Sequence, residues 1–169
     1  MKRTCFDWPA TALLWVACAM AALLVLAMMF EVFSRYVLNA PTLWAFDISY
    51  MLNGAMFMLG CAYALKIDAH VRIDFLAARL RPAVQRWING AFYLLLFAPI
   101  LGALTWTAGK RTWHALVTAE VEHVSPWAPL IWPFYSALAI GLAALTLQVL
   151  VDAYRYFTGQ KQPSGGLPE

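Results

Sequence analysis

The side chains that could carry out chemistry are few in this 169-residue chain, and many of them gather in one segment. The segment WHALVTAEVEHVSPW holds His114, Glu120, Glu122 and His123. Glu120 and His123 are spaced i, i+3, which would suit two ligands of one metal ion. Because this spacing is common by chance, a loop that faces solvent or a partner is the preferred interpretation, and a metal site is the alternative.

The sequence lacks the residue patterns of other common catalytic and redox sites. His70 is predicted below to lie on the opposite side of a membrane from His114 and His123, so no histidine pair could bracket a haem at mid-membrane. The sequence has no Ser/His/Asp set, P-loop or GxGxxG, and its three cysteines show neither metal-ligand nor disulfide spacing. Basic clusters beside aromatic residues are also missing. We therefore expect no enzyme, no cofactor and no nucleic-acid partner.

The composition indicates an integral membrane protein. Hydrophobic residues make up 63% of the chain and charged residues only 12%, which is too little charge to cover a soluble domain of this length. A bilayer core needs about 20 apolar helical residues, and four stretches qualify. In lipid each backbone polar group must be satisfied internally, so these stretches must be helical. The predicted helices are 10–34, 47–66, 84–108 and 127–157.

These four helices form one predicted all-α membrane domain, residues 1–158, followed by a flexible cytoplasmic tail, 159–169. The first apolar run is longer than the core of a signal peptide, so we expect it to remain as a membrane helix. Nine Lys and Arg residues fall on the side that holds both termini and the connection between the second and third helices, and three fall on the other side. The positive-inside rule therefore places both termini in the cytoplasm.

The segment KIDAHVRIDFLAARLRP, residues 66–82, connects the second and third helices. Its apolar positions Ile73, Leu76, Ala77 and Leu80 follow the i, i+3, i+4, i+7 spacing of one helical face. The spacing predicts a short amphipathic helix over 70–81, able to lie at the cytoplasmic surface with arginines facing anionic membrane lipids. A plain connecting helix is the alternative.

Several polar residues occupy particular positions in or beside the apolar runs. Glu31 and Arg35 are spaced i, i+4 and should pair at the end of the first helix, either as a plain helix end or as a contact with another helix or subunit. Asp47 begins the second helix, where a carboxylate suits the helix dipole. Asn53 should hydrogen-bond across a helix interface, within the chain or to another subunit. Gly60 would let helices approach closely.

The order of these motifs resembles the DctQ-type small membrane subunit of TRAP transporters. The stretches SRYVLNAPTLWAFDIS and FMLGCAYALKIDAHVRIDFL carry the likeness, over about 33–80. The family pattern has an acidic residue, more often Glu, at the position of Asp47, and a Glu or Ser where this chain has Ala45 and Phe46. The matching residues are Arg35, Tyr36, Asn39, Trp44, Asp47, Leu59, Gly60, His70 and Asp74.

The resemblance implies a small permease subunit in the bacterial inner membrane. Its partners would be a large multi-helix transport subunit with an elevator motion, a periplasmic binding protein that captures an organic acid such as a C4-dicarboxylate or sialic acid, and membrane lipids. A sodium gradient would drive this secondary active uptake without ATP. No substrate-binding residue transfers to this chain.

Two groups of site residues follow from these interpretations. Structural or interface roles are expected for Arg35, Asn39, Trp44, Asp47, Asn53, Gly60, His70, Arg72 and Asp74, and contact with the binding protein for Lys110, Arg111, Glu120 and Glu122. Two other classes remain open, namely the membrane anchor subunit of a haem- or quinone-containing redox complex and a free-standing four-helix protein.

Overall fold

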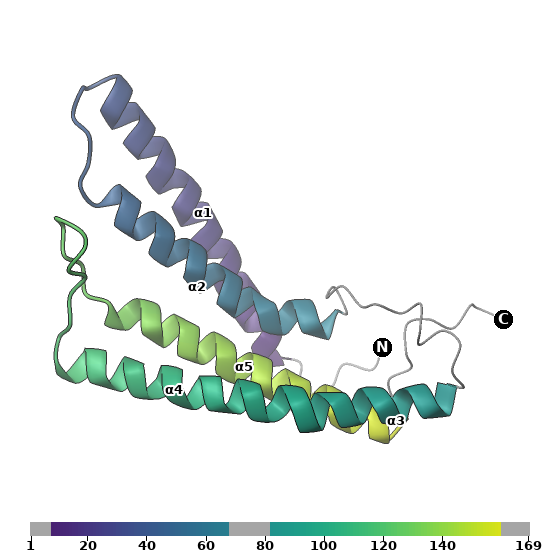
Figure 1. Ribbon diagram of the computed structural model, residues 1–169. Coiled ribbons are helices and arrows are strands. Elements are labelled where there is room, and N and C mark those ends of the chain that lie inside the picture. Colours follow the sequence, from purple (N-terminus) through teal and green to yellow (C-terminus); the bar gives the residue numbers. More distant parts are fainter. Residues whose placement is uncertain (1–7, 68–81, 160–169) are drawn as a thin grey trace.

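The computed structural model describes residues 8–67 and 82–159, and these residues form a set of long helices (Figure 1). The amphipathic helix predicted for 70–81, with His70, Arg72 and Asp74, and the tail 160–169 lie outside the described residues. The elements are α1 (Trp8–Tyr36), α2 (Ala45–Lys66), α3 (Pro82–Phe92), the π-helical segment η3 (Tyr93–Phe97), α4 (Ala98–Val117) and α5 (Trp132–Phe157).

Four helical stretches are long and apolar enough to cross a membrane, namely 10–36, 45–66, 84–117 and 132–157. The shortest has 22 residues and is about 33 Å long at 1.5 Å per residue, close to the thickness of a bilayer core. The structure therefore confirms the predicted all-α class with four membrane-spanning helices.

The third spanning helix is longer than the predicted range 84–108 and continues to Val117. Charged residues end the apolar run, but the helix continues past them, because Ala, Lys and Arg all favour helical backbone. Within this helix, η3 directly precedes Ala98 and Pro99. The N–H of Ala98 donates to the carbonyl of Tyr93, five residues back. Since Pro99 has no N–H for the carbonyl four residues earlier, the wider π turn accommodates it.

The fourth spanning helix begins at Trp132, later than the predicted residue 127. Ala128 has a φ of 47°, in the left-handed region, which interrupts a right-handed helix. Pro133 lies in the first turn of α5, where its missing N–H costs least. The residues before Trp132 consequently belong to the connection that follows α4.

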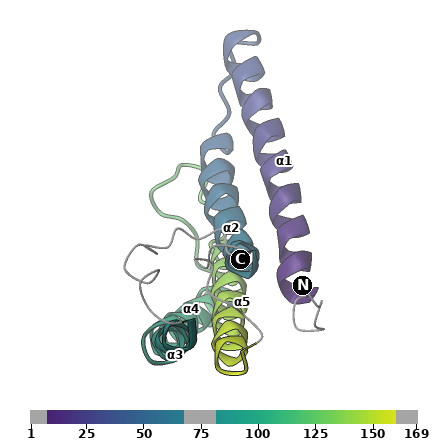
Figure 2. The ribbon, with the colours of Figure 1, turned by 90° about the vertical axis from the view of Figure 1, so that its right-hand side faces the viewer.

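The helices form an open row and do not close into a ring. α1 packs against α2, α2 against α5, and α5 against α4, η3 and α3. Figure 2 shows α1 and α4 on opposite sides of α2 and α5. Two broad faces of the row are left open by the helices of 8–67 and 82–159, so many of their large apolar side chains are exposed. Such extensive apolar exposure suits a protein whose solvent is lipid.

Small residues make up most of the buried apolar positions inside the row. Of the 13 buried apolar residues in the described part of the chain, eight are alanines, which is typical of membrane helices that pack by close approach. A close backbone approach joins α2 and α5 at Gly141, where a Cβ would lie 2.7 Å from the backbone carbonyl of Met58. At the next contact along the row, the hydroxyls of Thr105 and Thr146 lie 3.0 Å apart and connect α4 with α5.

Gly141→Leu should destabilise the α2–α5 contact, because backbone atoms of Met58 occupy the space that the new side chain needs. We expect the free energy of unfolding to fall by about 1–3 kcal/mol, the usual cost of overpacking. The change would be measured as a lower melting temperature of the protein in detergent. Gly102→Ala is the control, since nothing lies within 4 Å of a Cβ built there. Equal melting temperatures for the two variants would show that this close contact does not hold the row together.

Candidate functional site

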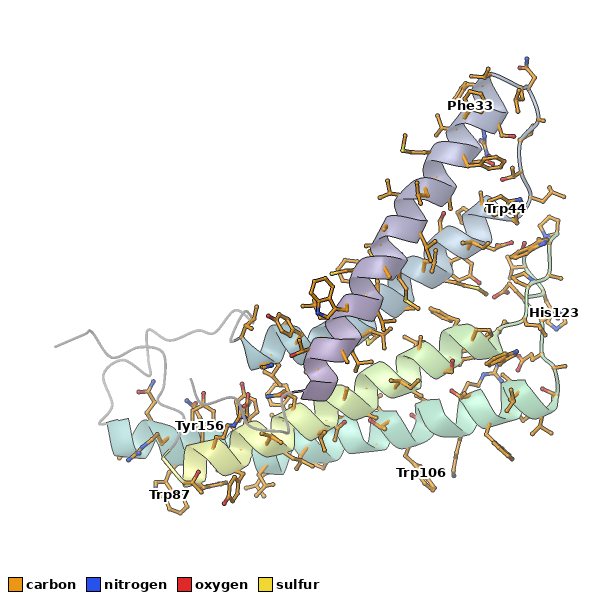
Figure 3. All side chains as sticks on the ribbon, turned by 180° about the vertical axis from the view of Figure 1, so that it is seen from behind. Phe33, Trp44, Trp87, Trp106, His123 and Tyr156 are labelled. Carbon is orange, nitrogen blue, oxygen red and sulfur yellow. The ribbon has the colours of Figure 1, made fainter. Side chains whose placement is uncertain are left out.

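Polar side chains concentrate at the end of the molecule that holds segments 37–44 and 118–131, which we call the loop end. The opposite end is called the terminal end. There α1 begins at Trp8, α2 ends at Lys66 and α5 ends at Phe157. In Figure 3, Phe33, Trp44 and His123 mark the loop end, and Trp87 and Tyr156 mark the terminal end. Both connections of the loop end fold back onto the helices through specific hydrogen bonds.

Glu31 organises the first connection. Its carboxylate accepts hydrogen bonds from Arg35 Nε (2.9 Å) and Nη2 (2.6 Å), which confirms the predicted i, i+4 pair. The backbone N–H of Thr42 (3.0 Å) and the Thr42 hydroxyl donate to the other oxygen. Glu31 is buried although Arg35 is half-exposed. A charge-assisted cluster thus fixes segment 37–44 against α1.

A turn lies within this segment. Asn39 has a φ of 52°, a left-handed conformation that Asn tolerates well. The backbone N–H of Ala40 donates to the carbonyl of Ser34 over 3.0 Å. Trp44 follows and stacks on Phe30 of α1, with ring centroids 5.8 Å apart. Trp44 therefore helps to hold α2 beside α1 as well as marking the helix start.

Asp47 attaches the second connection to α2. It lies in the first turn of α2, as predicted because a carboxylate suits the dipole at a helix start, and it is almost fully buried. The hydroxyl of Ser125, 78 residues away in the chain, donates to Asp47 Oδ2. Ser125 Oγ also accepts a hydrogen bond from the backbone N–H of Trp127 at 3.1 Å. This bond anchors segment 118–131 to the beginning of α2.

A second bond between the loop and α2 lies one turn further along the helix. The hydroxyl of Tyr50 donates to Glu122 Oε2 over 3.1 Å. The loop is itself folded as a hairpin, because the N–H of Glu122 donates to Pro129 (2.8 Å) and that of Ile131 to Glu120 (3.1 Å). Glu122 therefore contributes to the shape of the loop through its backbone and to its attachment through its carboxylate.

Arg111 joins α4 to the loop and to α5. Arg111 Nη2 donates to Glu120 Oε1 over 2.7 Å, and His114 Nδ1 lies 3.7 Å from Glu120 Oε2. The Arg111 guanidinium also stands over the ring of Tyr135, and Lys110 stands over the ring of Trp106. Arg111 and Glu120, proposed from the sequence for partner contact, are thus bonded to each other in this chain.

The surface that the loop leaves open to a partner is its tip. His123 is exposed, and Val124 is 92% exposed, the highest exposure among the large hydrophobic residues described. Among residues 8–67 and 82–159 no three His, Cys, Asp or Glu side chains come together as a metal site would require.

A buried carboxylate at the terminal end escaped the sequence analysis. Asp152 on α5 has no exposed surface. Gln148 Nε2 donates to it over 3.3 Å, and Arg155 Nη1 lies 3.6 Å away. The spacing of these three residues, four and then three apart, was the available signal. At the same end, Lys66 Nζ donates to Thr11 Oγ1 over 2.8 Å and connects α2 with α1.

Two predicted interface residues on α2 point away from the row. Asn53 is exposed, and no hydrogen bond joins its side chain to any other described residue. Gly60, two turns further, has no atom within 4 Å of an added Cβ. The expected hydrogen bond of Asn53 across a helix interface is therefore not made within the described chain.

The hydrogen bonds and ion pairs of the loop end attach its two connections to the helices and fix the shape of its surface. The four carboxylates of the loop end, Glu31, Asp47, Glu120 and Glu122, all accept hydrogen bonds from within the chain. An open row of four apolar helices with two anchored connections at one end defines an integral membrane protein with a preformed surface at that end. Comparison with known proteins places this architecture in a family.

Residues 24–159 match the family described as "Tripartite ATP-independent periplasmic transporters, DctQ component". The chain therefore belongs to the DctQ component family of these transporters. This membership confirms the resemblance seen in the order of the sequence motifs, which covers residues of α1 and α2. The matched range runs from the second half of α1 to the end of α5 and includes the other three spanning helices whole.

Individual relatives are similar over parts of their lengths. A stretch of 61 residues, 36% of this chain, is 38% identical to the sialic acid TRAP transporter small permease protein SiaQ of Vibrio cholerae and covers 35% of that protein. The C4-dicarboxylate TRAP transporter small permease protein DctQ of the same organism is 25% identical over 155 residues, covering 77% of this chain and 64% of that protein.

A third relative is a larger protein. The sialic acid TRAP transporter permease protein SiaT of Haemophilus influenzae is 30% identical over 70 residues, which are 41% of this chain and only 11% of SiaT. The chain thus spans less than two thirds of the length of each of these relatives.

Asp47→Ala should release the loop 118–131 from α2, because the Ser125 hydroxyl loses its acceptor. We expect amide hydrogen exchange at Glu122 and Ile131 to become about 5- to 150-fold faster, corresponding to a loss of about 1–3 kcal/mol. Asp47→Asn should have a smaller effect, since the amide oxygen still accepts. Ser136→Ala is the control, because that hydroxyl bonds only the carbonyl of Pro133 in its own helix. Unchanged exchange in Asp47→Ala would contradict the anchoring role.

Proposed function

We propose that this chain is the small permease subunit of a tripartite ATP-independent, sodium-coupled transporter for organic acids. It would stabilise the large transport subunit and help to dock the periplasmic binding protein. Family membership over residues 24–159 is the observation that carries the proposal. Sodium coupling and the organic acid class follow from the sequence resemblance, and relatives are named for sialic acid and C4-dicarboxylate transport.

The form of the helix row supports an accessory role. A carrier needs a polar path near mid-membrane, commonly built from broken helices. The contact between α4 and α5 at mid-helix has only a threonine pair, and the surrounding groove, about 590 Å³, is lined mainly by apolar and small residues. The two uncovered faces of the row are suited to packing against a larger membrane protein, and SiaT, a permease, contains a segment similar to part of this chain.

The same proposal places the chain in the bacterial inner membrane with both termini in the cytoplasm. Among the described basic residues, Lys66, Arg86 and Arg155 lie towards the terminal end, and their side would be cytoplasmic by the positive-inside rule. The loop end would then face the periplasm, where a binding protein could reach it. The redox-anchor alternative gains no support, since His114 and His123 are both exposed near the loop end.

Affinity purification of the tagged chain from gently solubilised bacterial membranes tests the proposed partnership. We expect a large multi-helix permease to co-purify in stable proportion. Proteoliposomes containing this pair should take up radiolabelled succinate or a sialic acid only with the binding protein added and an inward sodium gradient. The chain purifying without any large membrane partner would overturn the proposal.

The contacts at the loop end indicate which substitution tests docking of the binding protein. Charge reversal at Glu120 or Glu122 would break the intramolecular bonds to Arg111 and Tyr50, so Val124→Asp is the sharper variant. We expect this change at the exposed tip to lower binding-protein-dependent uptake about tenfold, because it introduces a charge into a contact surface.

Ile67→Asp, an exposed position at the terminal end, is the matched control and should leave uptake unchanged. Co-purification of the large subunit should be normal in both variants. Unaltered uptake by Val124→Asp would show that the tip does not contact the binding protein.

A further inference from the structure

The exposed amide of Asn53 occupies a position on a membrane-crossing helix where a polar group facing lipid is unfavourable. Asn53 lies eight residues into α2, about 12 Å from its start and about 20 Å from its end, well inside a bilayer core. Its side chain offers two N–H donors and a carbonyl acceptor. Lipid tails can bond none of these, and leaving such a group without a partner in an apolar medium is unfavourable.

Exposed or open residues line up with Asn53 along one side of α2. Phe46 and Gly60 stand seven residues before and after Asn53, which is nearly two full turns, and Phe57 stands one turn away. Phe46 and Phe57 are 78% and 63% exposed. A Cβ at Gly60 would meet nothing within 4 Å. We call Phe46, Asn53, Phe57 and Gly60 the Asn53 strip.

The nearby parts of the chain are already engaged elsewhere. Tyr50, one turn before Asn53, directs its hydroxyl to Glu122 of the loop. Gly54 faces Phe134 of α5, which a Cβ there would contact at 2.8 Å. The strip therefore lies beside the α2–α5 contact and is left uncovered by the described helices.

We propose that the Asn53 strip is the surface on which a transmembrane helix of the large transport subunit packs, with a polar side chain of that helix bonded to the Asn53 amide. This inference rests on the proposed function. Gly60 would allow the partner backbone to approach, and the two phenylalanines would flank it. The hydrogen-bonding requirement of Asn53 excludes a lipid tail as a sufficient occupant.

A large subunit is a better occupant than a second copy of this chain. In SiaT, the segment similar to this chain occupies 11% of a much larger permease, so a small segment of this type and a large membrane protein are there joined in one chain. Physical attachment of that kind is consistent with direct helix contact between the corresponding separate subunits.

Two substitutions test the strip in the complex co-purified from membranes. Asn53→Leu should weaken association of the large subunit about 3- to 30-fold, the range for interhelical hydrogen bonds in membranes. Gly60→Phe should weaken it by about tenfold or more, because the ring would occupy the partner's space. Since both positions are open in the free chain, neither variant should lower its melting temperature.

Matched variants on α4 serve as controls. Thr107→Val removes an exposed hydroxyl that bonds Leu104 O of its own helix at 2.9 Å, and Gly109→Phe fills another site with nothing within 4 Å. Both should leave association unchanged. A wild-type chain that binds no large subunit would overturn the proposed function itself.

Wild-type association that Asn53→Leu and Gly60→Phe leave intact would overturn the strip alone. A loss seen with Gly109→Phe and not with Gly60→Phe would place the partner on the groove between α4 and α5. Weakened self-association of the chain with normal binding of the large subunit would identify a second copy as the occupant. Each of the last two results also overturns the proposal.

Discussion

The crossing of α2 and α5 at Gly141 is the contact on which the rest of the structure depends. It joins the α1–α2 pair to the α4–α5 pair, and the described helices have no other extensive contact between these pairs. Glycine is needed there because backbone of Met58 fills the space of a Cβ. Since the two pairs meet along one line of small residues, the row stays open and presents two broad apolar faces to its surroundings.

The loop end depends on this crossing as well. Because α5 lies against α2, the loop that leads into α5 reaches the start of α2, where Ser125 meets Asp47 and Glu122 meets Tyr50. Charged and hydroxyl groups that would be mobile on an isolated hairpin are thereby held in one arrangement. A preformed loop reduces the entropy lost when a partner binds, which suits the docking role proposed for its exposed tip.

Family membership and the open row explain each other. A small permease component that works within a larger assembly has no need to enclose its own polar path. Its uncovered helix faces can be completed by a partner and by lipid. The exposed Asn53 and the buried Asp152 show two arrangements of a polar group on an apolar helix. The Asn53 amide is available on the surface, and the Asp152 carboxylate is contacted by Gln148 and Arg155 of its own helix.

The sequence by itself determined the four spanning helices, the Glu31–Arg35 pair and the family, because apolar run length, i, i+4 spacing and motif order are all local properties. Only the tertiary structure decided that Asn53 is exposed, that Asp152 is buried and that Asp47 holds a loop 78 residues away. These helices are apolar nearly all round, so no polar stripe indicates which side faces a neighbour. That choice depends on which helices lie side by side, and it is set by contacts between residues far apart in the chain.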